Sequence, residues 1–219
     1  MATRTVEQYV KTLYLLEHLR STNVVQMKTL SEAMEVTPGS ATAMVKHLHD
    51  EGLITYYPRK GAELTPEGRR LALRMIRRHR LIETFLERVL GYDWSEVHLE
   101  AEELEHAVSE TFIERVDALL ESPTLDPHGD PIPRADGTVD APHFVPLSEV
   151  PHGTEFEVAR IGSDDGDFLT LMKERGIVPG ARFVLTEKSQ TAGTISVRAA
   201  ATGASFTLGY DIGQKILVR

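Results

Sequence analysis

The sequence predicts a mostly α-helical chain with a small β part: an N-terminal winged helix-turn-helix, a helical middle domain and a C-terminal antiparallel β-barrel. Three features predict this order. Apolar residues recur at helical spacing through much of residues 5–120, two short helical segments meet at VTPG (36–39), and short alternating strands occupy residues 150–218. The two patterns differ because side chains repeat every 3.6 residues in a helix and every two in a strand.

Length and composition allow more than one domain. At 219 residues with 41% hydrophobic residues, the chain can bury two or three small cores. It has no cysteine, which excludes disulfides and thiolate metal sites and is typical of a reducing compartment. The start MATRTVEQYV lacks the pattern of a signal peptide, and no apolar run approaches the roughly 20 residues that span a bilayer. We therefore expect a cytoplasmic protein without a membrane segment.

The charges are distributed unevenly along the chain. Residues 1–80 hold 13 Lys+Arg against 8 Asp+Glu, whereas residues 81–219 hold 11 against 25. The net charge of −9 therefore conceals a basic N-terminal part. A basic module joined to an acidic remainder is expected of a protein that binds a polyanion with one part and cations with the other.

The N-terminal elements predict a winged helix over residues 1–64. A first helix over about residues 5–18 is followed by the short helices KTLSEAME (28–35) and SATAMVKHLHDEG (40–52). The turn between the short helices contains Pro38 and Gly39, and Thr37 or Ser40 can cap the second of them. LITYYP and AELT then predict two strands around the turn RKG, which is the hairpin that forms the wing.

The middle domain is predicted to be helical over residues 65–141. Thr65 can cap a long helix and Pro66 suits its first position, while Gly91 ends it. A further single helix is expected from about Trp94 to Leu120. Residues 122–146 hold more than half of the 11 prolines and show no periodicity, which predicts a linker or an ordered long loop.

The C-terminal domain, residues 142–219, predicts a small antiparallel β-barrel. The segments VPHGTEFEVARI, ARFVLTEK, TISVRAAA, SFTLGY and KILV are alternating or apolar, and Gly-rich turns separate them. One short helix is expected near DFLTLMKERG. A peptide-binding role for the barrel is a minor alternative, because the segments show no obvious aromatic cluster.

The stretch HLEAEELEHAVSE (98–110) crowds five glutamates and two histidines into thirteen residues. On one helix, His98, Glu102, Glu105 and His106 fall within an arc of about 100°, whereas Glu100, Glu103 and Glu110 lie toward its edges or away from it. His79 and Glu83 likewise share a face of the preceding helix. Imidazole and carboxylate ligands without sulfur suit Mn²⁺, Fe²⁺, Zn²⁺ or Co²⁺, and the excess of carboxylates favours Mn²⁺ or Fe²⁺.

Two other interpretations compete with a metal site. Most acidic helix faces are simply solvated, and a single His-x-x-x-Glu pair is more often a surface salt bridge; the second pair on the preceding helix favours metal binding. Glu103-x-x-His106 matches half of a di-iron carboxylate motif, but the sequence offers no second helical copy. A di-metal carboxylate enzyme would also have no need of the basic N-terminal module.

The second short helix carries the residues expected to meet DNA. Small and basic side chains occupy the positions that enter the major groove in a helix-turn-helix, and a basic pair lies at the wing tip. Helix-turn-helix geometry also occurs as a plain structural corner, but the wing and the local positive charge favour DNA binding. The candidate DNA-binding residues are Thr37, Ser40, Thr42, Lys46, His47, Arg59 and Lys60.

Taken in order, these motifs resemble the diphtheria-toxin-repressor and manganese-transport-regulator family of metal-dependent transcriptional repressors. The resemblance covers nearly the whole chain, through the winged helix, HRLIETFL, HLEAEELEH, DPHGDPIP and VPHGTEFEVARI…LMKERGIVPG. It implies a dimerisation role for the helical domain, an SH3-like (FeoA-like) barrel, and a homodimer that binds palindromic operator DNA when loaded with Mn²⁺ or Fe²⁺. Such a protein represses metal-uptake genes and is not an enzyme.

The resemblance also implies two metal sites per subunit. The primary site would use Glu102, Glu105 and His106, with His79 in this or the neighbouring site. A second site would use Glu83 with His98, or Glu83 with Asp126, His128 and a barrel acid, either Asp164 or Asp167. Glu102 occupies a position where iron-type members have cysteine, which favours Mn²⁺.

The N-terminal helix departs from the family pattern. Gln8, beside Glu7, stands where members supply a Met or Asp ligand, and Lys11 replaces an acid found in some manganese-type members. A glutamine carbonyl can ligate Mn²⁺ but adds no charge, and Lys11 argues against a closely spaced dinuclear site. A winged-helix regulator of a small organic ligand remains an alternative, although the acidic lining argues against an apolar pocket.

Overall fold

A computed structural model describes residues 3–20, 23–140, 142–163 and 165–219. The chain forms two compact units, one of residues 1–79 with 133–138 and the other of residues 80–132 with 139–219. The division falls inside the long helix α4 (Pro66–Arg88). No helix of the described residues has both the length and the apolar character needed to cross a membrane.

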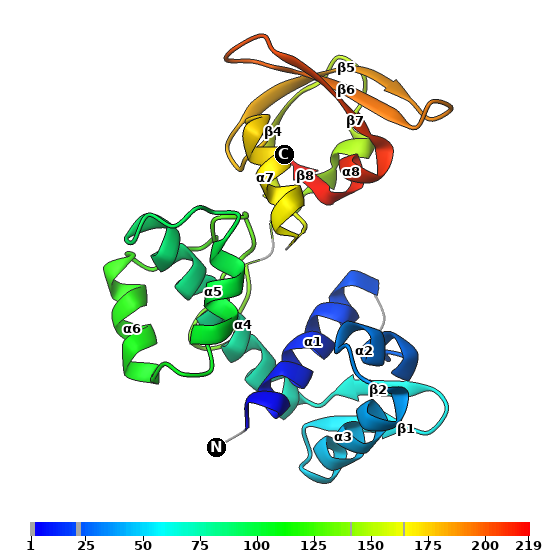
Figure 1. The fold of residues 1–219 in the computed structure, drawn as a ribbon, viewed down its shortest axis with the longest axis vertical. Coiled ribbons are helices and arrows are strands. Elements are labelled where there is room, and N and C mark those ends of the chain that lie inside the picture. Colours follow the sequence, from blue (N-terminus) through cyan, green and yellow to red (C-terminus); the bar gives the residue numbers. More distant parts are fainter. Residues whose placement is uncertain (1–2, 21–22, 141, 164) are drawn as a thin grey trace. The chain divides into compact units, whose positions relative to one another are not determined.

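The N-terminal unit is a winged helix, as the sequence predicts (Figure 1). Its strands pair antiparallel, with Tyr57 opposite Gly61 at the wing tip. Thr37 caps the second helix of the helix-turn-helix by accepting a hydrogen bond from the backbone N–H of Ser40 at 3.2 Å. Before α4, the elements are α1 (Arg4–Arg20), α2 (Met27–Ala33), α3 (Pro38–Asp50), β1 (Ile54–Tyr57) and β2 (Gly61–Leu64).

One apolar core holds the winged helix together. Helices α1, α2 and α3, the hairpin and the start of α4 all contribute to it. Val10, Leu13, Leu30 and Leu48 are completely buried there. The side chains that the periodicity of residues 5–18 assigns to one helix face are therefore the ones that pack inward.

The helical part of the second unit contains a break that the apolar spacing of the sequence does not predict. The prediction of a single helix from Trp94 to Leu120 is wrong. Helix α5 (Val97–Leu104) ends at Leu104, and α6 (Glu110–Leu119) begins six residues later. Ser109 caps α6 by accepting a hydrogen bond from the backbone N–H of Phe112 at 3.2 Å. A capping serine satisfies an N–H at a new helix start, so it stabilises the interruption.

The segment between the helices and the barrel is an ordered loop over most of its length. Leu125 and Pro131 form an isolated antiparallel bridge, and the turn between them is DPHGD (126–130). The Asp126 carboxylate closes this turn by accepting hydrogen bonds from the backbone N–H groups of His128 and Asp130, both at 2.9 Å. An aspartate that bonds its own downstream backbone is a common way to fix a turn.

The C-terminal part is an antiparallel barrel-like sheet with strand order β3-β8-β4-β5-β6-β7. Its helices are η1 (Leu147–Glu149), α7 (Gly166–Glu174) and α8 (Tyr210–Lys215), of which only α7 is expected from the sequence. Its strands are β3 (Val145–Pro146), β4 (Glu155–Ile161), β5 (Arg182–Ser189), β6 (Thr194–Ala199), β7 (Ser205–Gly209) and β8 (Ile216–Val218).

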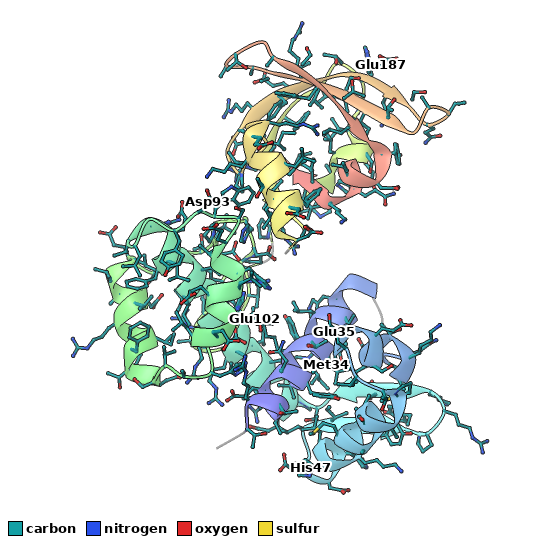
Figure 2. All side chains as sticks on the ribbon, in the orientation of Figure 1. Met34, Glu35, His47, Asp93, Glu102 and Glu187 are labelled. Atoms are coloured by element: carbon teal, nitrogen blue, oxygen red, sulfur yellow. The ribbon has the colours of Figure 1, made fainter. Side chains whose placement is uncertain are left out.

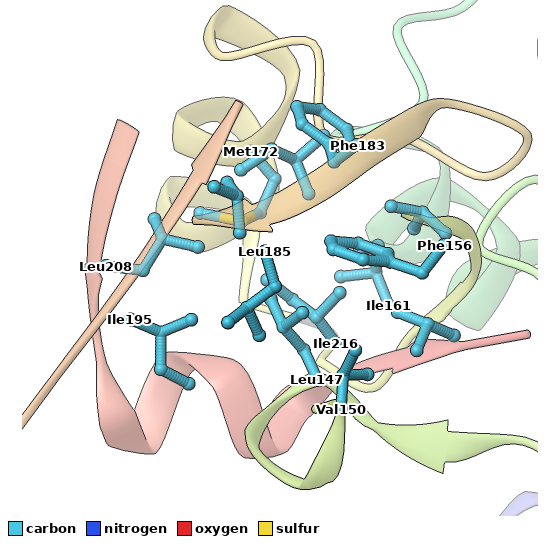
Figure 3. Close-up of a cluster of buried hydrophobic side chains, with 14 of the residues drawn as sticks. Leu147, Val150, Phe156, Ile161, Met172, Phe183, Leu185, Ile195, Leu208 and Ile216 are labelled. Carbon is cyan, nitrogen blue, oxygen red and sulfur yellow. The ribbon is translucent and has the colours of Figure 1, made fainter. Parts of the chain in front are cut away.

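The barrel has its own apolar core, shown in Figure 3. Alternate side chains of the strands point inward, and Met172 of α7 packs among them. Phe156 and Phe183 stack with ring centroids 6.0 Å apart. Trp94, which precedes α5, belongs to the same core. The barrel is thus packed against the end of the helical part through one large aromatic side chain.

Candidate metal centre

Helix α4 presents two candidate ligands on one buried face. His79 and Glu83 are four residues apart on this helix, so their side chains point the same way, and both are buried. In the N-terminal unit, the buried Lys11 ammonium lies 3.1 Å from Nδ1 of His79. Because an ammonium group can only donate, Nδ1 of His79 accepts this hydrogen bond.

Helix α5 and the turn after it place the acidic stretch against α4. Nδ1 of His98 lies 3.2 Å from Oε1 of Glu83, and Nε2 of His98 lies 3.9 Å from Oε1 of Glu102. In the turn, Nε2 of His106 lies 3.3 Å from Oε1 of Glu105. Glu105 is completely buried and Glu102, labelled in Figure 2, is half-buried. By contrast, the three remaining glutamates of the stretch, Glu100, Glu103 and Glu110, are exposed.

Three groups of side chains among the described residues could each hold a metal ion, because their ligand atoms lie within 4.8 Å of one another. Two of the groups include His79, which α4 carries one turn before Glu83. The groups are His79 with Glu83 and His98, His79 with Glu102 and Glu105, and Glu83 with Asp126 and His128. All of the donors are imidazole nitrogens and carboxylate oxygens, the set that Mn²⁺ and Fe²⁺ share with other divalent first-row ions.

The surroundings of Asp126 shift the pKa of its carboxyl. Burial raises the pKa of the Asp126 carboxyl well above its usual range, and the nearby charges of Asp130 and Glu83 raise it further. Arg80 opposes this shift, with its Nε 3.6 Å from Oδ2 of Asp126. Buried carboxylates this close together favour a proton or a metal ion among them.

The remaining candidate ligands come from helix α1 and from the region of helix α7. On α1, Oε1 of Gln8 is buried and has no hydrogen-bond partner among the described residues, whereas Glu7 is half-buried. On α7, Asp167 is exposed and belongs to none of the three groups found among those residues. Asp164 lies outside the described residues.

Several polar residues around Asp126 were not anticipated from the sequence. Arg80 donates to the carboxylate of Asp130 at 2.9 Å, and Arg160 of β4 contacts the same oxygen at 2.7 Å. Nε2 of His128 lies 2.8 Å from the backbone carbonyl oxygen of Trp94. The repeated Asp-Pro of DPHGDP was the available signal, since it places a second aspartate in the same turn.

The candidate DNA-binding residues lie mostly on the surface of the winged helix. Ser40, Lys46 and His47 are exposed on α3, and Figure 2 labels His47. Arg59 and Lys60 are exposed at the wing tip. Thr37 and Thr42 are engaged within the helix, since Thr37 caps it and the Thr42 hydroxyl donates to the carbonyl of Pro38 at 2.7 Å.

Models of known protein families match all three parts of the chain. Residues 1–62 match the N-terminal DNA-binding domain of iron-dependent repressors. Residues 65–134 match the metal-binding and dimerisation domain of the same repressors. Residues 145–219 match the FeoA domain.

Individual proteins resemble the chain over most of its length. The iron-dependent repressor IdeR of Mycobacterium leprae is 32% identical over 205 residues, which cover 88% of this chain and 87% of that protein. A solved manganese-dependent transcriptional repressor in complex with manganese is 41% identical, with a TM-score of 0.89, and the match covers 97% of this chain and 98% of that one. The structure of ScaR with bound Zn²⁺ is 34% identical, with a TM-score of 0.82 and 98% coverage of both chains.

Proposed function

Since this chain belongs to the family of iron-dependent repressors, we propose that it is a homodimeric repressor that Mn²⁺ activates and that binds palindromic operator DNA of metal-uptake genes. Proteins of this family are metal-dependent transcriptional regulators and not enzymes. The observation that carries the choice of metal is the donor set of α4 and α5, which is rich in carboxylates and contains no sulfur.

The proposed primary site uses Glu102, Glu105 and His106 with His79. Carboxylate and imidazole donors suit a hard or borderline cation, and a carboxylate at Glu102 favours Mn²⁺ over softer ions. Fe²⁺ is the alternative, because the same donors bind it. On α1 the buried Oε1 of Gln8, which has no hydrogen-bond partner in the described part of the chain, fits a neutral oxygen ligand; Glu7 is the alternative from the same helix.

The proposed second site uses Glu83 and His98, which gives two sites per subunit. These side chains are within hydrogen-bond distance at 3.2 Å and come from different helices, α4 and α5. An ion bound to both would fix the two helices to each other. We also propose the limits of three domains: a winged-helix domain of residues 1–64, a helical metal-binding and dimerisation domain of residues 65–141, and a β-barrel domain of residues 142–219.

The proposed dimer uses exposed apolar side chains at the end of α4 and on α5 and α6. Leu99 is 76% exposed and Leu119 is 61% exposed, and Val89, Leu90 and Phe112 are also exposed. Large apolar side chains that remain exposed are candidates for a protein–protein interface. A homodimer presents two winged helices, so a palindromic operator would match its symmetry.

Metal would act by favouring one arrangement of the dimer. Ligands from α1 and from the helices α4 and α5 can share one ion only when these elements are close together. An ion that binds one arrangement better shifts the population toward it. Operator affinity would then follow the metal concentration without any covalent chemistry.

A mobility-shift titration tests this function. Metal-free protein is mixed with promoter DNA of candidate metal-uptake genes, and Mn²⁺, Fe²⁺ or Zn²⁺ is added, with a chelator as the control. We expect a shift with Mn²⁺ that the chelator reverses. Glu102→Ala should lose the response, whereas Glu103→Ala, which changes an exposed neighbour on the same helix, should keep it. DNA binding that ignores every metal would contradict the proposal.

A further inference from the structure

A buried ion pair joins three elements of the winged helix. The side chain of Glu17, near the end of α1, is only 3% exposed. Its Oε1 accepts a hydrogen bond from the backbone N–H of Leu64 at 2.9 Å, and its Oε2 accepts one from Nη2 of Arg69 at 2.5 Å. Leu64 is the last residue of β2, and Arg69 lies in the first turn of α4. One carboxylate therefore ties α1 to the wing and to α4.

We propose that Glu17 is a positioning residue that transmits metal binding from α1 to the wing and to the start of α4. The inference rests on the proposed function, because it requires an ion that binds a ligand on α1, such as Gln8, and that raises operator affinity. It adds the contact through which the ion acts on the DNA-binding surface. In this role Glu17 touches neither the ion nor the DNA.

Stability alone does not explain a carboxylate at this place. The core around it is apolar, and Leu13 and Leu64 belong to that core. Taking a carboxylate out of water costs free energy that a buried ion pair recovers only in part, and apolar side chains of similar volume often stabilise a protein equally well. A buried ion pair does fix geometry, because its hydrogen bonds are directional, whereas apolar contacts have no preferred direction.

Arg69 is held by α1 from a second side. Its guanidinium carbon lies 5.5 Å from the centre of the Tyr14 ring. Tyr14 is three residues before Glu17, so the two side chains are neighbours on the surface of α1. A guanidinium group is attracted to the face of an aromatic ring and fits a carboxylate with its planar fork. A lysine at position 69 would keep the charge and lose this planar group.

Helix α1 connects the ion pair to the proposed metal ligand. Gln8 precedes Glu17 by nine residues on the same helix, which is about 14 Å along the helix axis. The sequence of α1 contains neither proline nor glycine, the residues at which helices most often kink. A displacement of the part of α1 that holds Gln8 therefore reaches Glu17.

The wing receives this displacement at its base. Leu64 lies opposite Ile54, where the hairpin of β1 and β2 begins (Figure 1). At the other end of the hairpin, Arg59 and Lys60 are exposed at the tip. Because the backbone N–H of Leu64 is bonded to Glu17, a shift of α1 turns the hairpin about its base. The tip, which carries the proposed phosphate contacts, then moves farther than the base does.

The test compares operator affinity with and without Mn²⁺. Glu17→Gln keeps an oxygen that can accept from Leu64 and removes the charge that binds Arg69. It should lower the ratio of the two operator affinities by about 2- to 30-fold, the range for residues that contribute to coupling. The Mn²⁺ affinity of the DNA-free protein should stay unchanged. Glu67→Gln, which removes an exposed ion pair with Arg70 on the same helix, should keep the wild-type ratio.

Substitutions of Arg69 test the same contact from α4. Its side chain is 38% exposed, so these variants are available if Glu17→Gln does not fold, and thermal unfolding identifies the variants that are folded in the assay. Arg69→Gln should lower the ratio as Glu17→Gln does, and Arg69→Lys should retain more of it. Since Glu17 and Arg69 act as one unit, the double variant should lose no more than either single variant.

The outcomes separate this role from the proposed function. Wild-type ratios in both Glu17→Gln and Arg69→Gln would overturn the role of Glu17 and leave the proposed function intact. Losses that add in the double variant, or an equal loss in Glu67→Gln, would also overturn it. A weaker Mn²⁺ affinity of DNA-free Glu17→Gln would place Glu17 in the metal site instead. Wild-type protein that binds the operator equally with and without Mn²⁺ would contradict the proposed function, and this inference with it.

Discussion

The winged helix and the helical segment 80–132 differ in where their proposed functional side chains lie: on the surface in the first and in the interior in the second. In the winged helix the buried side chains are mostly apolar, and residues proposed to meet DNA, such as Lys46 and Arg59, are exposed. In segment 80–132 the buried side chains include the candidate ligands Glu83, Glu105 and His128. Stability and DNA contact therefore depend on different residues in the first region. In the second region the proposed ligands are buried beside an apolar core, so both kinds of side chain contribute to its stability.

This difference has an energetic consequence. Burying a carboxylate costs several kcal/mol unless a cation or hydrogen bonds compensate it. In segment 80–132 a bound metal ion would supply that compensation, so the stability of this region should rise with metal concentration. The apolar core of the winged helix has no such dependence, since burying apolar surface stabilises it in the presence or absence of metal.

The largest expected effect is a loss of stability from a core substitution in the winged helix, which tests whether the stability of this region is independent of metal binding. Leu48 is completely buried on α3, so Leu48→Ala should lower the free energy of unfolding by about 2–5 kcal/mol. Chemical denaturation measures this change. The Mn²⁺ affinity of the folded protein should stay the same. An altered Mn²⁺ affinity at a temperature where the variant is folded would contradict the separation.

The second prediction is a loss of Mn²⁺ affinity when a proposed metal ligand is removed. Glu105 is completely buried beside His106, and Glu105→Ala should weaken Mn²⁺ binding by more than about 100-fold, the upper range for loss of an outer-shell partner alone. Calorimetric titration of metal-free protein measures the affinity. Glu103→Ala provides the exposed control. Equal Mn²⁺ affinity of the Glu105→Ala variant and the wild type would remove Glu105 from the site.

A smaller effect is expected for the proposed DNA surface. Lys46 is exposed on α3, two residues before Leu48. Lys46→Ala should weaken binding to all DNA sequences alike and reduce the salt slope of the binding constant by about 1, because it removes one phosphate contact. Fluorescence anisotropy at several salt concentrations measures the slope. If the slope is unchanged while specificity is lost, Lys46 contacts bases instead.

The smallest effect concerns a surface ion pair between the helical part and the barrel. The hydrogen bond from Lys173 is the main cause that lowers the pKa of the Asp93 carboxyl from 3.8 to about 2, and hydrogen bonds from Ser95 contribute less. Since the pKa in the folded state lies below its unfolded value, the pair stabilises the protein above about pH 4 and loses this effect as the pH falls toward 2. The Asp93 side chain is 36% exposed, so solvent screening limits the contribution to about 0.5 kcal/mol.

Asp93→Asn should therefore lower the free energy of unfolding by about that amount at pH 7 and by less at pH 3. Denaturation at the two pH values measures the difference, and Lys173→Met provides the second edge of a double-mutant cycle. If Asp93→Asn lowered the free energy of unfolding more at pH 3 than at pH 7, the ionised Asp93 carboxylate would not be the form that stabilises the folded protein.

Local signals made most of the fold predictable. The cap at Thr37, the turn RKG and the Pro66 helix start each act within a few residues, and the structure confirms all three elements. The helix break after Leu104 was missed although Ser109 is a capping residue, because the apolar spacing continues across it. Helix α8 was missed because it is short and contains Gly213, which has low helix propensity.

The candidate site was predictable only where its residues share a helix. The spacing of His98 and Glu102, and of His79 and Glu83, places each pair on one helix face. The contacts of Asp126 with Arg80, and of Asp130 with Arg160, join residues far apart in the chain. They depend on how the turn 126–130 packs on α4 and β4, which no local pattern specifies.

In the proposed mechanism, metal binding and DNA binding are energetically coupled. The most direct test is the Mn²⁺ affinity of the chain measured with and without its operator DNA. Coupling is reciprocal, so the operator should raise the Mn²⁺ affinity by the same factor by which Mn²⁺ raises the operator affinity, in the range of about 5–150-fold. Equal Mn²⁺ affinity in the presence and absence of operator DNA would show that metal binding and DNA binding are not coupled.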